Sequence, residues 1–122
     1  MKSIDGMTLE ELRSWRPEKA EFSEIRQMAG EIAKAFTPHK IILFGSYAKG
    51  NATAESDVDL LVIMESSDPP PLRSVGMYRL LNGYMIPVEI MVRTPAEIER
   101  YKDVSFSVIH AALREGITLY ER

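Results

Sequence analysis

The sequence predicts a small α/β (α+β) domain in which helices pack against a mixed β-sheet of three to five strands. Amphipathic and short apolar segments alternate along the chain, which is typical of helices interleaved with strands. The chain has 122 residues, which suits one domain, and 45% of them are hydrophobic, which is enough for one sizeable core.

We divide the chain into an N-terminal extension, residues 1–17, and one domain, residues 18–122. In the extension, Thr8 is the expected N-cap of a short helix. In the domain, apolar residues recur every three or four positions from Glu18 to Phe36. This spacing predicts an amphipathic helix that stops at Thr37-Pro38.

Three strands are predicted after this helix. Lys40 to Phe44 is a continuous apolar run, which indicates a strand buried on both faces. Asp57 to Met64 is the second strand, and Tyr84 to Val92 is the third, with Pro87 marking a sheet edge or the strand's beginning. Side chains of the second strand alternate between two faces, one with Val58, Leu60, Val62 and Met64 and the other with Asp57, Asp59, Leu61 and Ile63.

Further helices are predicted between and after the strands. They cover Leu72 to Asn82, Thr94-Pro95 to about Lys102, and about Ser105 to Glu115, with a short helix or turn from Ser46 to Gly50. Thr94 is the expected N-cap of its helix, with Pro95 at the first helical position. A short extension, Ile117 to Tyr120, follows the last helix.

The composition excludes several classes of function. Cysteine is absent, so disulfides, thiolate zinc sites and thiol nucleophiles are excluded. The formal net charge is −3, which gives no overall attraction to nucleic acid, and no apolar run approaches the length of a membrane span. We therefore expect a cytoplasmic protein that binds neither a membrane nor, directly, nucleic acid.

Two aspartates stand in the second strand, where carboxylates are disfavoured. Asp57 and Asp59 are two positions apart, so their side chains share a face, with Cα atoms roughly 6.5–7 Å apart. Glu89 on the third strand could face the same way. Three carboxylates on neighbouring strands repel one another, and a divalent metal such as Mg²⁺ resolves that repulsion. The alternative is a structural role, in which these charges protect an edge strand from aggregation and bind no metal.

Gly45-Ser46 stands where the first strand turns into a helix. Glycine lets a backbone approach a phosphate closely, and the serine hydroxyl adds a donor. The loop is not a Walker motif, because Asn51-Ala52 follows Gly50 where that motif has Lys-Ser/Thr.

The combination of Gly45-Ser46, a ten-residue gap and Asp57-Val58-Asp59 resembles the signature of the DNA polymerase β-like nucleotidyltransferase superfamily, and most closely its minimal nucleotidyltransferase (MNT) branch. The resemblance extends from about Ile25 to Tyr120. It implies a small nucleotidyltransferase fold and a nucleoside triphosphate, ATP as substrate, with its phosphates at Gly45 and Ser46. It also implies two Mg²⁺ ions held by Asp57, Asp59 and Glu89, with Asp59 bridging them.

The resemblance carries two further expectations about residues. Lys49 falls where the family has a basic residue, and we expect it to bind the nucleotide. Glu89 departs from the family, whose third carboxylate is usually Asp, and the extra methylene moves the carboxylate by about 1 Å or more. Either the site adapts and Glu89 remains a metal ligand, or catalysis is weakened and the protein mainly binds.

MNT proteins of this size resemble antitoxins that silence HEPN-domain toxins by adding AMP to a toxin tyrosine. We therefore expect an Mg²⁺-dependent transfer of AMP from ATP to a hydroxyl of a partner HEPN toxin. A single short domain leaves little surface to enclose a base and an acceptor, so a partner chain or a second copy in a homo-oligomer would complete the site. Two alternatives stay open, an antitoxin that acts by complex formation alone and a nucleotidyltransferase that acts on a small molecule.

Overall fold

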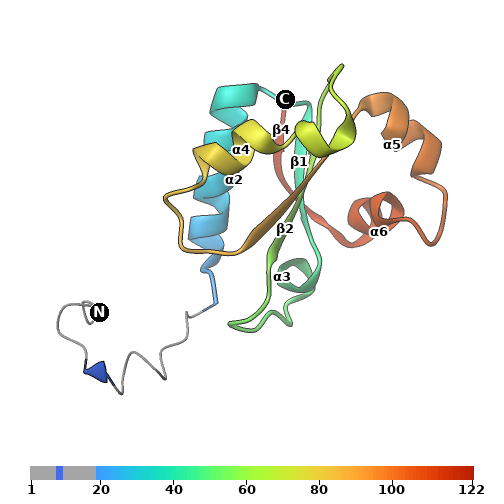
Figure 1. Cartoon of the computed structure of the whole chain (residues 1–122). Coiled ribbons are helices and arrows are strands. Elements are labelled where there is room, and N and C mark those ends of the chain that lie inside the picture. The colour runs from blue at the N-terminus through green and yellow to red at the C-terminus, as the bar shows by residue number, and fades with distance from the viewer. Residues whose placement is uncertain (1–7, 10–18) are drawn as a thin grey trace.

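A four-stranded mixed sheet forms the centre of the protein (Figure 1). The computed structural model describes residues 8–9 and 19–122. The strand order is β3-β2-β1-β4, in which β1 pairs antiparallel with both β2 and β4, and β2 pairs parallel with β3. The strands are β1 (Lys40–Phe44), β2 (Val58–Ile63), β3 (Val88–Arg93) and β4 (Ile117–Glu121). The sheet confirms the predicted fold class.

Helices cover both faces of this sheet, with α2 and α4 on one side and α5 and α6 on the other (Figure 1). The short helix α3 lies at the end of β1. The helices are α2 (Phe22–Phe36), α3 (Ser46–Lys49), α4 (Val75–Leu80), α5 (Pro95–Tyr101) and α6 (Val108–Glu115), with a 3₁₀ turn η2 (Pro70–Leu72) before α4. None of the helices within the described residues is both long and apolar enough to cross a bilayer.

The predicted alternation of β2 is confirmed by two separate cores. Leu60 and Val62 are fully buried on the face covered by α2 and α4, together with Ile25 and Ile32 of α2. Leu61 is fully buried on the opposite face, against Ala112 of α6 and its neighbours. Because helices bury both faces of β2, a charged side chain on this strand is tolerated only at a position that the helices do not cover.

Capping residues set the ends of the helices, and they shorten two of the predicted ones. The first helix, predicted from Glu18, begins at Phe22, because Glu21 is its N-cap and the Glu21 N–H donates to Glu24 at 3.1 Å. It ends as predicted at Thr37, whose φ of 45° is left-handed. The last helix begins at Val108 rather than Ser105, because Ser107 caps it by accepting from the His110 N–H at 3.0 Å.

Prolines explain two other differences from the sequence prediction. The predicted helix from Leu72 to Asn82 is divided into η2 and the shorter α4, because the three prolines before Leu72 favour a tight 3₁₀ turn. The third strand was predicted from Tyr84 but begins at Val88, since Pro87 has no N–H to donate and only its carbonyl pairs, accepting from the Val58 N–H at 2.8 Å.

The structure tests the prediction for the C-terminal end of the chain but not the prediction for the N-terminal end. The C-terminal extension after Gly116 is a true strand, β4, which pairs with β1. Of the predicted N-terminal helix, only Thr8 and Leu9 lie within the described residues, so the division at residue 17 stays a prediction.

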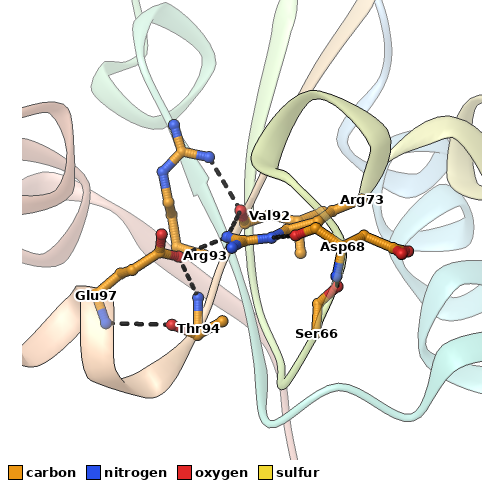
Figure 2. Close-up of polar contacts among 7 residues, drawn as sticks. All are labelled: Ser66, Asp68, Arg73, Val92, Arg93, Thr94 and Glu97. Atoms are coloured by element: carbon orange, nitrogen blue, oxygen red, sulfur yellow. Dashed lines mark hydrogen bonds and ion pairs between the residues drawn. The ribbon is translucent and has the colours of Figure 1, made fainter.

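Arg73, from the segment between β2 and α4, and Tyr78 of α4 close the outer edge of β3. Figure 2 shows the contacts of Arg73. The Arg73 side chain is only 9% exposed, and its guanidinium pairs with Glu97 at 2.6 Å and donates to the Val92 carbonyl at 3.3 Å. Its Nε donates to the Asp68 carbonyl at 2.9 Å. The Tyr78 hydroxyl accepts from the Ile90 N–H at 2.7 Å. Arg73 therefore joins the loop, the edge strand and the start of α5.

Removing Arg73 should destabilise the protein. The Glu97 carboxylate accepts from the Thr94 N–H at 2.8 Å, and this bond, with Arg73, keeps the pKa of Glu97 below its usual value. We expect Arg73→Ala to lower the free energy of unfolding by about 1–3 kcal/mol, measured by urea denaturation, since a charged hydrogen-bonded group loses its partner. Arg79→Ala, at an exposed position of α4, is the matched control and should change it by less than about 0.5 kcal/mol. Equal effects of the two substitutions would contradict the role given to Arg73.

Candidate active site

One row of side chains crosses three strands of the sheet. Phe44 of β1 is paired with Asp59 of β2, and Asp59 is paired in turn with Glu89 of β3. Neighbouring strands lie about 4.8 Å apart, and directly paired residues point to the same face. The structure thus places Glu89 beside Asp59, on the face that α5 and α6 cover further along the strands.

Asp59 is the most enclosed of the three predicted carboxylates. Its side chain is half-buried, whereas Asp57, immediately before β2, and Glu89 are exposed. Burial raises the pKa of Asp59, and the charges of Glu89 and Asp57 raise it further. The three carboxylates are therefore close enough to repel one another, and a bound cation would reverse this effect.

Asp57, Asp59 and Glu89 could hold metal ions only together with other ligands. Among the described residues, no three His, Asp or Glu side chains are arranged so that they alone could hold one ion. Mg²⁺ in nucleotide enzymes is ordinarily bound by one or two carboxylates together with substrate phosphates and water. The three carboxylates are neighbours and are accessible to solvent, which suits this way of binding Mg²⁺. The phosphates of the nucleotide would then supply the missing oxygen ligands.

Gly45 packs directly against the Asp59 carboxylate. Its backbone, with φ 74° and ψ −154°, lies in a region that only glycine adopts readily. A Cβ added at Gly45 would overlap Asp59 Oδ2 and would lie 3.2 Å from its Cγ. The position therefore requires glycine for two independent reasons, and Ser46 follows it as the first residue of α3.

Lys49, at the end of α3, faces the last helix. Its ammonium lies 3.5 Å from the Glu115 carboxylate of α6, and both side chains are about half exposed. A pocket of about 220 Å³ opens at this place. It is lined by Phe44, Gly45, Lys49, Val108, Ala111 and Glu115. Sequence reasoning found neither Glu115 nor this pocket, because no local pattern reveals that α6 lies beside α3.

A larger pocket, of about 580 Å³, lies on the other side of α3, between Tyr47 and the start of α2 at Phe22. None of the three predicted carboxylates lines it. The polar groups suited to phosphoryl chemistry instead gather at the Phe44–Asp59–Glu89 row.

Comparison with known proteins identifies the family of this chain. Residues 9–117 match the family described as the nucleotidyltransferase domain. The chain belongs to this family. A Methanocaldococcus jannaschii protein that carries the name "putative protein adenylyltransferase" is 67% identical over 81 residues, which are 66% of this chain and 77% of the relative. The protein is thus a nucleotidyltransferase, and its Gly45–Asp59 contact and carboxylate row belong to a nucleotidyltransferase domain.

Solved structures share the fold of this nucleotidyltransferase at low sequence identity. A Sulfolobus solfataricus protein described as a "putative nucleotidyltransferase" gives a TM-score of 0.58 at 19% identity, over 82% of this chain and 79% of that one. A chain from the crystal structure of a toxin-antitoxin with AMP-PNP gives a TM-score of 0.56, also at 19% identity, over 80% and 73% of the two chains. These likenesses establish the fold.

Substituting Gly45 should damage both stability and activity. We expect Gly45→Ala to lower the free energy of unfolding by about 2 kcal/mol or more, because backbone strain adds to the clash with Asp59. Gly50 also has a positive φ, 80°, but a Cβ there would meet nothing within 4 Å. Gly50→Ala is therefore the control for backbone strain alone, with an expected loss of about 1 kcal/mol. Equal losses in thermal denaturation would argue against the steric contact.

Neutralising Asp59 should stabilise the fold while abolishing function. Because the pKa of Asp59 is raised in the folded state, its ionised form opposes folding, and this cost appears as the pH rises through that pKa. We expect Asp59→Asn to raise the Tm by about 1–4 °C at pH 7 without metal, and to lower nucleotidyl transfer by about 100-fold or more. Asp103→Asn, in an exposed loop, is the control and should not raise the Tm. A lower Tm for Asp59→Asn would contradict the repulsion.

Proposed function

We propose that this nucleotidyltransferase moves AMP from ATP to a hydroxyl group of a partner protein, and that it acts in this way as an antitoxin. The acceptor that fits best is a tyrosine of a HEPN-domain toxin. The observation that carries the proposal is the Gly45–Asp59 contact with Glu89 in register beside it. The relative named as a protein adenylyltransferase and the toxin-antitoxin likeness with AMP-PNP support the substrate and the class of partner.

In the proposed reaction, the acceptor hydroxyl oxygen bonds to the α-phosphorus of ATP. The bond from that phosphorus to the bridging oxygen of the leaving pyrophosphate breaks, and the hydroxyl proton passes to Glu89 directly or through water. Gly45 and Ser46 would hold the phosphates of the leaving group. Since they lie on the β1 side of Asp59 and Glu89 lies on the β3 side, the acceptor would approach from β3 for an in-line transfer.

Asp57, Asp59 and Glu89 would hold two Mg²⁺ ions together with the phosphates. When bound, the ions would neutralise phosphate charge and lower the pKa of the acceptor hydroxyl. The task of the protein residues is mainly positioning. Asp59 is held by its packing on Gly45, whereas Glu89 is exposed on an edge strand and has freedom to reach an acceptor.

A second function is favoured by one observation. No trio of acidic or His side chains among the described residues is arranged to hold an ion alone, and the resemblance to the MNT family implies Asp where this chain has Glu89. An antitoxin that neutralises its toxin by occluding it would need no complete catalytic site. The two functions differ in whether neutralisation depends on the carboxylates.

The proposal is tested by incubating the purified protein with a co-encoded HEPN protein, ATP and Mg²⁺. We expect intact-mass spectrometry to show one AMP added to the HEPN protein, and tandem spectrometry to place it on a tyrosine. Glu89→Gln should lower the rate of transfer by about 100-fold or more, whereas Glu89→Asp should stay within about tenfold of the wild type.

Growth rescue in cells separates the two functions. If transfer is the mechanism, the double variant Asp57→Ala, Asp59→Ala should fail to neutralise the toxin although it still folds and binds it. Neutralisation by this double variant, with no adduct on the toxin, would establish occlusion instead. Asp103→Asn is the control and should neutralise like the wild type.

A further inference from the structure

We propose that Tyr47 is a positioning residue for the turn at Gly45 and Ser46. Its hydroxyl holds α3 in place, and through α3 it holds the turn, without touching the nucleotide. This inference rests on the proposed function, in which Gly45 and Ser46 hold the phosphates of a nucleoside triphosphate. Tyr47 itself lies in the wall of the larger pocket, on the side of α3 away from the carboxylate row.

The short helix α3 needs contacts with other elements to keep its place. It is a single helical turn of four residues, Ser46–Lys49, and a helix this short has little stability of its own. Its beginning is fixed by Gly45, which packs on the Asp59 carboxylate. At its end, Lys49 pairs with Glu115, but both side chains are about half exposed, and such a pair contributes little. The middle of α3 must therefore be held by another contact.

Tyr47 provides this contact. Its hydroxyl accepts a hydrogen bond from the Ala20 N–H at 2.9 Å, and its half-buried ring packs against the core on the α2 side of the sheet. Ala20 is buried, so an N–H left without a partner there would be costly. The two residues are 27 positions apart in the sequence. Their bond joins α3 to the segment directly before α2, at the end of the sheet where α3 lies and α2 begins (Figure 1).

The position of Ser46 depends on Tyr47, because the two residues are adjacent in the same helical turn. The Gly45 carbonyl accepts from the Lys49 N–H at 3.1 Å, so the turn and α3 move together. The contact of Gly45 with the carboxylate row anchors the beginning of this unit, and the Tyr47 hydroxyl anchors its middle. Without the hydroxyl, α3 can pivot on Gly45, and the groups that bind phosphate lose their alignment.

The chain contains a matched control for this role in Tyr78. Its hydroxyl also accepts a hydrogen bond from a backbone N–H, that of Ile90 at 2.7 Å, but at the outer edge of β3. Tyr47→Phe and Tyr78→Phe each keep the ring and remove one such bond. Both should therefore lower the Tm by a similar amount, about 2–8 °C. Only Tyr47→Phe should also weaken the binding of phosphates.

The test is isothermal titration of the full chain with ATP and with inorganic tripolyphosphate, in Mg²⁺ and well below the Tm of both variants. We expect Tyr47→Phe to raise the Kd for both ligands by the same factor, about three- to tenfold, because both carry the triphosphate. Tyr78→Phe should leave both Kd values within about 1.5-fold of the wild type. In the transfer assay, Tyr47→Phe should raise the KM for ATP and leave kcat within about twofold, since the turn holds phosphates before and during transfer.

Several results would overturn this role. Unchanged Kd values for Tyr47→Phe, equal rises for both tyrosine variants, or a fall in kcat at unchanged KM would each mean that Tyr47 does not position the turn. A rise for ATP alone would mean that Tyr47 contacts the nucleoside instead. Because binding is measured without an acceptor, the expected Kd values without any transfer would support the role and refute only the proposed transfer. A wild-type protein that binds neither ligand would overturn both.

Discussion

The contact between Gly45 and the Asp59 carboxylate is the constraint on which the rest of the site depends. It brings the turn after β1 against the beginning of β2 and leaves no room for a side chain at Gly45. The direction in which α3 departs and the position of the half-buried carboxylate are therefore fixed together. Moving either one would require moving the other, so the turn and the charged strand act as one rigid unit.

The sheet provides the stability that such a charged unit requires. Leu60 and Leu61 are both fully buried, one on each face, so β2 is held between two helical layers. Asp59 stands one residue before Leu60, where α5 and α6 no longer cover it completely. Carboxylates that repel one another are tolerated at this end of β2 because solvent reaches them. The buried apolar residues from Leu60 onward hold the strand in place.

Much of the fold was predictable because its signals are local. Alternation along β2 predicted which face carries Asp59. Pro87 indicated either a sheet edge or the beginning of the third strand, although the strand itself was predicted from Tyr84. The strand β4 was described only as an extension, because most of its side chains are exposed and its partner, β1, is far away in the sequence. Within the candidate site, spacing predicted that Asp57 and Asp59 share a face, whereas the roles of Glu89 and Gly45 were implied by the family resemblance. Glu115 and the pocket beside it depend on how α6 packs, and no short stretch of sequence encodes that.

The side chains along the outer edge of β3 have a consequence for assembly. Tyr78 and Arg73 occupy the Ile90 N–H and the Val92 carbonyl, the outward-facing backbone groups that another strand would use to extend the sheet. Over this stretch the edge is thus closed to strand addition, whether by a second copy of the chain or by an unrelated peptide. If a partner protein presents its hydroxyl to Glu89, as proposed, it would not be recognised by strand pairing along this stretch of β3, but through side chains and shape.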